Sequence, residues 1–305
     1  MQPRDSLVLE FWDRNKGLSI KNKSYRDFAS EFFEILLNND IKNKDLTTSS
    51  LISSKKNISA AIIAREDGIL AGIEEFSLIN NNLKLKFFKK DGDKIKNGDI
   101  IVKINGNAKK ILERERISLN ILQRMSGIAT LVHSLNKIAN DKIKIAATRK
   151  TLWGLLDKKA VSIGDGLTHR LSLSDGIIIK DNHLKLLNYD IEMALNLAKN
   201  KSKYIEIEVE NKKQALIAAK EIKKLIKHGN KGLYAMMLDN IPPYKIKAII
   251  QKLNNQNLYD YVLLEASGNI NTKNLIEYKD CGVDVISMGF ITNSAKVLNM
   301  SMEIE

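Results

Sequence analysis

The sequence predicts an α/β protein with a parallel β-sheet or barrel in its second half, after a smaller β-rich region. After residue 140, short apolar runs alternate with amphipathic stretches, as they do in repeated βα units. Most of these runs are almost continuously apolar, which is typical of parallel strands covered on both faces. With 305 residues and 44% hydrophobic content, the chain can bury a large core in one or two domains.

The first half of the chain contains three recognisable elements. Residues 24–39 place apolar side chains on one helical face and begin with a serine that can cap a helix. Residues 60–112 contain Asp-Gly and Asn-Gly pairs at 67–68, 91–92, 97–98 and 105–106, which are β-hairpin signals. Residues 113–140 repeat apolar side chains at helical spacing, and Gly127 among them predicts a close crossing with another helix.

The second half of the chain contains six apolar runs that we interpret as strands. They are IKIAATRK, GIIIKD, YIEIEVE, YAMMLDN, YVLLEASG and DVISMG, and helices are expected over 186–200, 212–228, 243–253 and 272–280. Each run ends on residues that can do chemistry: Arg149 and Lys150, Lys180, Glu208, Asp239, Ser267 and Gly268, and Gly289. Because the carboxyl ends of barrel strands meet at one mouth, these residues are expected to converge.

The converging residues indicate an anionic ligand. Lysine and arginine total 49 but only nine are arginine, and five of these lie between residues 114 and 170. Arginine offers a rigid bidentate fork for carboxylate or phosphate, although Arg114 and Arg124 can equally form ordinary pairs on a helix surface. Together with Glu208 and Asp239, the cations suit a polyanionic substrate held with a divalent metal.

Composition argues against several other classes of protein. The net charge of +13 comes from lysines spread along the whole chain, so it does not single out nucleic acid as a partner. The first residues lack the apolar core of a signal peptide, and no stretch approaches the roughly 18 apolar residues of a membrane span. We therefore expect a cytoplasmic protein. The single cysteine, Cys281, excludes an intrachain disulfide.

Eight motifs then occur in one order and spacing: ERISLNILQRMSGIAT, ATRKT, THR, IKDNH, EIEVE, LDN, EASG and ISMG. They closely resemble the quinolinate phosphoribosyltransferase family, also called nicotinate-nucleotide pyrophosphorylase (carboxylating), from about residue 25 to about residue 295. The resemblance implies an open α/β barrel of fewer than eight strands over 116–290. It also implies an N-terminal α/β sandwich domain over 25–115, completed by 291–305. Residues 1–24 are left as an N-terminal extension of unknown role.

The activity implied by the resemblance is that of a pentosyltransferase in NAD biosynthesis. Quinolinate and phosphoribosyl pyrophosphate, with substrate-associated Mg²⁺, would give nicotinate mononucleotide, CO₂ and pyrophosphate. The family also implies a homodimer with shared active sites, with a hexamer as the larger alternative, and neither a nucleic-acid nor a membrane partner. Three alternatives stay open: a related phosphoribosyltransferase acting on another acid, a basic nucleic-acid-associated protein, and an inactive member of the family.

The resemblance also implies roles for particular residues. Lys150, Glu208 and Asp239 would be catalytic, and the two carboxylates would also hold the metal. Arg116 would reach the site from the partner subunit. The full set implied to bind substrate is Arg116, Thr148, Arg149, Lys150, His169, Arg170, Lys180, Glu208, Asp239, Ser267, Gly268, Asn269 and Gly289.

Two positions depart from the family pattern. Asp165 stands between Gly164 and Gly166 where the family usually has three glycines, and it is expected to put a negative charge close to an anion site. Asn269 follows Ser267 and Gly268 where the family usually has a second glycine. Because asparagine tolerates left-handed backbone better than most residues, Asn269 is expected to keep the turn while narrowing the phosphate pocket.

Overall fold

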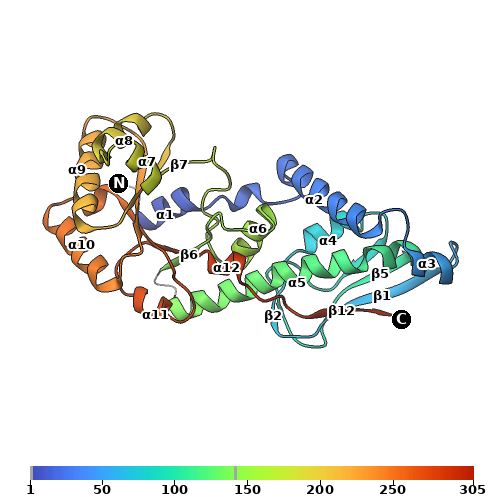
Figure 1. The fold of residues 1–305 in the computed structure, drawn as a ribbon. Helices are drawn as coiled ribbons and strands as arrows, with labels where there is room; N and C mark the ends of the chain where they lie inside the picture. The colour runs from blue at the N-terminus through green and yellow to red at the C-terminus, as the bar shows by residue number, and fades with distance from the viewer. Residues whose placement is uncertain (1–2, 141–142) are drawn as a thin grey trace. The chain divides into compact units, whose positions relative to one another are not determined.

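The computed structural model describes residues 3–140 and 143–305, which form two compact units. The first unit comprises Met1–Arg14, Ser134–Thr151 and Gly166–Asn293, and the second comprises Asn15–His133, Leu152–Asp165 and Ser294–Glu305. Residues 1–2 and 141–142, which fall within the expected N-terminal extension and barrel, lie outside the described residues. Figure 1 shows the elements of both units.

The first unit is an open barrel of six parallel strands, as the sequence predicted. In chain order the strands are β6 (Lys144–Ala146), β7 (Ile177–Ile179), β8 (Tyr204–Val209), β9 (Leu233–Asp239), β10 (Leu263–Ser267) and β11 (Val285–Ser287). They pair in the order β6-β11-β10-β9-β8-β7, so β6 and β7 are the two edges. An isolated parallel bridge between Ala146 and Leu167 follows β6 at the open side.

Helices follow the barrel strands in the chain. They are α7 (Asp181–Leu186), α8 (Ile191–Ala198), α9 (Lys212–Lys227), α10 (Pro243–Asn255), α11 (Leu275–Tyr278) and α12 (Phe290–Asn293), with a 3-10 turn η2 (Tyr259–Tyr261) before β10. Figure 1 shows α8, α9 and α10 on the outside of the strands. The helix expected over 186–200 begins only at Ile191, as α8, because α7 ends at Leu186 and Asn188 and Tyr189 then adopt left-handed backbone, with φ of 51° and 58°.

An N-terminal helix that the sequence reading missed, α1 (Arg4–Trp12), belongs to the barrel unit. Its residues Val8, Phe11 and Trp12 pack against Leu263 and Val285, which are the first residues of β10 and β11. Arg4 pairs with both carboxylate oxygens of the residue before β11, Asp284, at 2.6 and 2.7 Å. Residues 4–14 are therefore part of the barrel unit, and α1 closes the amino-terminal end of the strands.

The second unit is a four-stranded antiparallel sheet covered by helices. The sheet order is β12-β1-β5-β3, formed by β12 (Met300–Ile304), β1 (Asn57–Ala64), β5 (Ile100–Asn107) and β3 (Lys84–Phe87), and β2 (Gly68–Ile69) pairs separately with β4 (Lys94–Ile95). The helical elements are η1 (Asn15–Gly17), α2 (Lys23–Ile41), α3 (Leu46–Leu51), α4 (Ile73–Ile79), α5 (Ala108–Ala139) and α6 (Leu155–Ile163). The last residues of the chain thus complete this sheet, as the resemblance implied.

Three expectations about this unit differ from the structure. Asn22, rather than Ser24, caps α2 by accepting a hydrogen bond from the Tyr25 amide. The pair 105–106 lies inside β5 instead of in a turn. A side chain at Gly127 would overlap the backbone carbonyl of Lys296, so its close neighbour is an irregular segment and not a helix. Helix α5 runs without interruption through the boundary expected at 115–116, and the two compact units divide within it, between His133 and Ser134.

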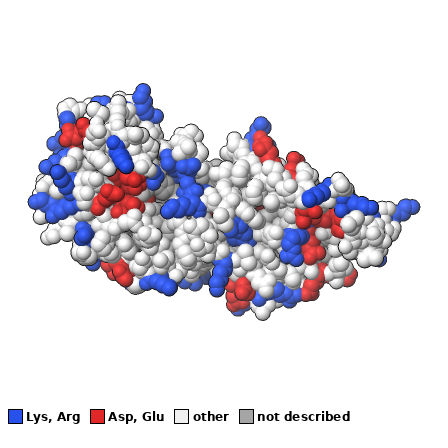
Figure 2. Space-filling model, viewed as in Figure 1, with Lys and Arg blue, Asp and Glu red and all other residues white. Residues whose placement is uncertain are grey.

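Charged side chains of both signs are spread over the face of the molecule drawn in Figure 2. Figure 2 shows Lys and Arg on the visible face interspersed with acidic and uncharged residues. Among the described residues, no helix is both long enough and apolar enough to cross a bilayer.

Candidate active site

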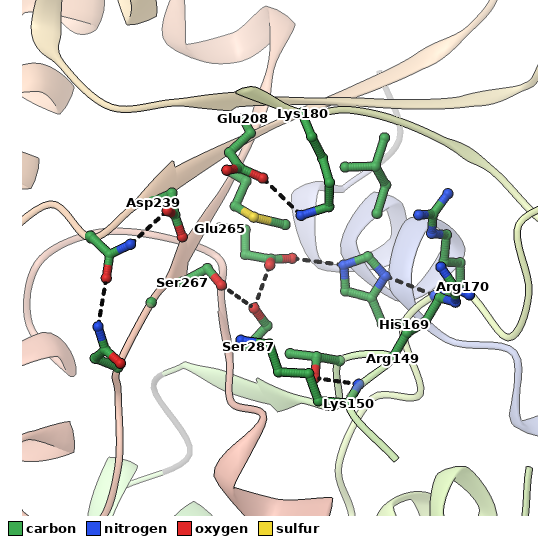
Figure 3. A pocket seen from close by; sticks show the side chains of 16 residues that line it. Arg149, Lys150, His169, Arg170, Lys180, Glu208, Asp239, Glu265, Ser267 and Ser287 are labelled. Atoms are coloured by element: carbon green, nitrogen blue, oxygen red, sulfur yellow. Dashed lines mark hydrogen bonds and ion pairs between the residues drawn. The ribbon is translucent and has the colours of Figure 1, made fainter. Parts of the chain in front are cut away.

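A cavity of about 460 Å³ lies at the carboxyl ends of the barrel strands (Figure 3). Every strand-end residue predicted from the sequence except Gly289 lines it. The lining is Thr148, Arg149, Lys150, His169, Arg170, Ile178, Lys180, Glu208, Met237, Asp239, Asn240, Glu265, Ser267, Gly268, Asn269 and Ser287. Gly289 lines a second cavity of about 270 Å³. The two cavities adjoin, because Thr148, Lys150, Ser267, Gly268 and Asn269 line both.

Arg116 and Asp165 lie in the second unit and are not among the described residues that line either cavity. Arg116 is exposed on α5. Asp165 has φ of 66°, a left-handed conformation that glycine adopts without strain, and its side chain is 82% exposed. Its carboxylate lies 3.9 Å from Nδ1 of His133 in the same unit.

Cations occupy the part of the cavity next to the barrel opening. Arg149 and Lys150 follow β6 and are exposed, and Lys180 follows β7. Arg170 donates a hydrogen bond from Nη1 to the carbonyl of Gly176 at 2.8 Å. Burial, together with the positive charge of Arg149, lowers the pKa of Arg170. These cations repel one another, so an anion placed among them is stabilised.

The carboxylates of Glu208 and Asp239 occupy the strand ends next along the sheet. Glu208 Oε2 accepts a hydrogen bond from Lys180 Nζ at 2.9 Å. Burial raises the pKa of Glu208, and the charge of Asp239 adds to this while Lys180 opposes it. A divalent cation would relieve the repulsion between the two carboxylates, which offer the hard oxygen ligands that Mg²⁺ prefers. Two carboxylates are too few to hold the ion alone, so the pair suits a metal that also takes oxygens from the substrate.

A buried cluster formed by His169, Glu206 and Glu265 adjoins the cavity, which His169 and Glu265 line. Nε2 of the imidazole is 3.2 Å from Glu265 Oε2 and 3.4 Å from Glu206 Oε2. Nδ1 accepts a hydrogen bond from the Arg170 backbone amide at 2.8 Å. Ser287 Oγ donates to the other oxygen of Glu265. Both ring nitrogens of His169 thus have partners within the protein, which fixes the ring at the cavity wall.

The buried cluster retains protons that separated groups would lose. Burial alone would lower the pKa of His169, but the charges of Glu265 and Glu206 outweigh burial and raise it to about 9. Burial and the charge of Glu265 raise the pKa of Glu206 to about 7. Apart from the imidazole, no donor among the described residues reaches the Glu206 oxygens. The cluster therefore shares its protons, and its titration steps belong to the group as a whole.

The sequence reading missed Glu206, Glu265, Ser287 and Asn240. A usable signal was present, because Glu206 and Glu265 are charged residues in the middle of runs that are otherwise apolar, in YIEIEVE and YVLLEASG. A carboxylate in a strand covered on both faces must find a partner, and it is rarely buried without one. Alternation along β8 places Glu206 on the same face as Glu208 and so points it toward the same interior.

Comparison with known proteins gives a consistent result for both units. Residues 45–126 match the N-terminal domain of quinolinate phosphoribosyl transferase, and residues 128–303 match its C-terminal domain. A protein of Methanothermobacter thermautotrophicus, named as a probable nicotinate-nucleotide pyrophosphorylase (carboxylating), is 38% identical over 87% of this chain and 95% of its own length. A Bacillus subtilis protein with the same name is 38% identical over 87% of this chain and 89% of its own length. The solved nicotinate-nucleotide pyrophosphorylase of Francisella tularensis superposes with a TM-score of 0.78 at 30% identity, over 92% of this chain and 96% of that one.

Proposed function

The chain belongs to the quinolinate phosphoribosyltransferase family, and we propose that it transfers the phosphoribosyl group of phosphoribosyl pyrophosphate to quinolinate with loss of CO₂. The products are nicotinate mononucleotide, CO₂ and pyrophosphate, which makes this a step of NAD biosynthesis. One observation carries the proposal for this chain: a single cavity places several cations beside the barrel opening and two carboxylates on the neighbouring strands.

The cations suit the dicarboxylate substrate. Quinolinate carries two adjacent carboxylates, and moving them out of water costs free energy unless cations and donors meet them. Arg149, Lys150, Arg170 and Lys180 supply that charge, and the arginines can bind a carboxylate bidentately. A substrate that lacks one carboxylate leaves part of this charge unpaired, so nicotinate should bind much more weakly. His169 contributes through its fixed ring, since both of its nitrogens have protein partners.

The reaction needs positioning more than acid or base catalysis. The quinolinate nitrogen bonds to ribose C1′ with its lone pair while the bond from C1′ to pyrophosphate breaks. In the resulting pyridinium, the bond to the carboxylate next to the nitrogen then breaks. Its electron pair stays on the ring carbon, where the adjacent positive nitrogen stabilises it, and a proton from water takes the place of CO₂. Orientation of the two substrates and stabilisation of charge at C1′ are therefore the tasks of the protein.

The carboxylates and the small residues suit phosphoribosyl pyrophosphate. Glu208 and Asp239 can stabilise positive charge at C1′, and they would hold Mg²⁺, which balances the charge of the departing pyrophosphate when bound. The adjoining cavity is lined by Gly268 and Gly289, where close backbone approach allows amide groups to reach a phosphate. Thr148 and Lys150 line both cavities, so one substrate can span them.

The proposal includes a homodimer whose active sites are shared. Arg116 lies on α5 and not at the end of a barrel strand, and the family resemblance supplies its role through a partner subunit.

Cys281 is buried and forms no disulfide, which suits the reducing cytoplasm. We assign the protein to that compartment as part of the same proposal.

A turnover assay tests the function directly. Quinolinate, nicotinate and nicotinamide are each supplied with phosphoribosyl pyrophosphate and Mg²⁺, and CO₂ and mononucleotide are measured. The proposal requires Mg²⁺-dependent CO₂ release from quinolinate. Equal or faster turnover of nicotinate would show that the cavity serves a different acid, and tight heparin binding without any turnover would favour a nucleic-acid partner.

A further inference from the structure

We propose that Asn269 is a positioning residue for Asp239, acting through Asn240, and that it thereby strengthens binding of the phosphoribosyl substrate with its divalent cation. The inference rests on the proposed function, because that function assigns Asp239 to the ribose and metal end of the cavity. It concerns a side chain at a position where the family usually has none.

The three side chains form a directed chain of hydrogen bonds along one wall of the cavity (Figure 3). Asn269 Nδ2 donates to Asn240 Oδ1 at 3.0 Å, and Asn240 Nδ2 donates to Asp239 Oδ2 at 2.6 Å. The Asp239 carboxylate can only accept, so it meets the NH₂ end of Asn240, and the bond from Asn269 to the Asn240 oxygen reinforces that orientation. Were the Asn240 amide reversed, its oxygen would face the carboxylate, and that contact would be repulsive.

The hydrogen bond from Asn240 affects the carboxylate in two ways. It is short and charge-assisted, so it restricts rotation of the Asp239 carboxylate and engages Oδ2. The other oxygen is left to a ligand. A hydrogen bond accepted at Oδ1 also polarises the Asn240 amide and makes its NH₂ group a better donor, so Asn269 strengthens a contact that it does not itself make.

The backbone is shaped to bring these side chains together. Asn240, Gly268 and Asn269 all have left-handed backbone, with φ of 52°, 97° and 53°. The Asn240 amide donates to the Ser267 carbonyl at 2.9 Å, which joins the ends of β9 and β10. A side chain at Gly268 would overlap that of Asn240. Left-handed backbone at non-glycine residues costs free energy and often accompanies functional sites.

The backbone of Asn269 is held independently of its side chain. Its carbonyl accepts hydrogen bonds from Nδ2 of Asn274 at 3.2 Å and of Asn271 at 3.4 Å. Asn269→Gly therefore removes only the side-chain amide, because glycine adopts φ of 53° readily and the carbonyl contacts persist. Asn269→Asp has the same shape but cannot donate, and it adds a like charge near Asp239.

Calorimetric titration with phosphoribosyl pyrophosphate and Mg²⁺, in the absence of quinolinate, tests the inference. Asn269→Gly should weaken this binding about three- to tenfold, the range for one net hydrogen bond, and Asn269→Asp should weaken it more. Binding of quinolinate should change less than about twofold. The matched control is Asn188→Gly, which replaces another exposed left-handed asparagine that lies outside both cavities and should leave both affinities unchanged.

A double-mutant comparison isolates the route through Asn240. In an Asn240→Gly background, adding Asn269→Gly should have no further effect, because its only path to Asp239 is gone. Unchanged binding in Asn269→Gly, equal weakening for both substrates, or a full additional loss in the Asn240→Gly background would overturn the inference. A wild-type protein that binds the phosphoribosyl substrate without turning over quinolinate would refute the proposed function alone, and the variants would still decide this inference. A wild-type protein that does not bind it would refute both.

Discussion

Replacing Glu206 with glutamine should make the stability of the protein less dependent on pH. Glu206 is 1% exposed, and burial together with the charge of Glu265 raises its pKa to about 7, from an ordinary value of 4.5. Glutamine has nearly the same shape and does not ionise. Glu206→Gln therefore removes the titration of this group with little change in packing.

The sign follows from the proton balance between the folded and unfolded states. A carboxyl group with a raised pKa binds more protons when the protein is folded, so its contribution to stability is complete below about pH 4.5 and is lost as the pH rises through 7. His169 acts in the same direction, because its pKa is raised from 6.5 to about 9 and its contribution is lost between these values. The difference between pKa 4.5 and about 7 for Glu206 corresponds to about 3 kcal/mol.

Urea unfolding of the wild type and Glu206→Gln at pH 5, 6, 7 and 8 measures this effect. The variant should gain on the wild type by roughly 2–3 kcal/mol between pH 5 and pH 8, since it loses no Glu206 proton and its His169 is no longer influenced by the charge of Glu206. A difference between wild type and Glu206→Gln that stays constant to about 0.5 kcal/mol would show that Glu206 is ionised throughout and that the cluster shares no proton.

Four further predictions concern other parts of the molecule. Lys150→Ala should weaken quinolinate binding while thermal unfolding changes little, because the side chain is exposed at the barrel mouth; a Tm many degrees lower with unchanged activity of the folded fraction would make Lys150 structural. Asp165→Gly should stabilise the protein against urea by up to about 1 kcal/mol, because glycine adopts φ of 66° without strain. Arg4→Ala should lower the free energy of unfolding by about 1–3 kcal/mol through loss of the paired contacts with Asp284, with activity of the folded protein retained. Arg116→Ala and Lys150→Ala homodimers should each be nearly inactive. Random reassociation of the two variants should restore about a quarter of wild-type activity, because about half of the dimers are then heterodimers with one intact site. If a mixture shown by mass to contain heterodimers recovers no activity, Arg116 lies outside the shared site.

The barrel strands were predictable because their pattern is local. Each run is apolar over its own length, and its last residues can be read without knowing what surrounds it. The convergence of Lys180, Glu208 and Asp239 on one cavity then follows from parallel pairing alone, since each lies at or beside a strand's carboxyl end. The amino-acid sequence is therefore sufficient to place these three side chains at one mouth.

The elements that were missed depend on contacts between distant parts of the chain. Helix α1 is short, and the burial of its apolar residues depends on strands such as β10 and β11, which lie more than 240 residues later in the chain. Glu206 and Glu265 are charged residues that do not fit the apolar pattern of their strands. Their partner, His169, comes from a different loop and lies between them. The Asn240 amide, which donates to Asp239, accepts a hydrogen bond from Asn269 at the next strand end. The residue pattern of a single segment does not reveal these contacts.

The order of the strands around the barrel explains why the two ends of the site carry different side chains. Around the sheet from its open side, Lys180 follows β7, Glu208 lies in β8 and Asp239 ends β9. Small residues follow at β10 and β11, and Arg149 and Lys150 return to the open side after β6. The carboxylates of quinolinate and the ribose and phosphates of phosphoribosyl pyrophosphate therefore meet different side chains. The buried glutamates do not cancel this arrangement, because the protons that the cluster retains offset their charge, so the carboxylates of the substrate meet the cations of the rim.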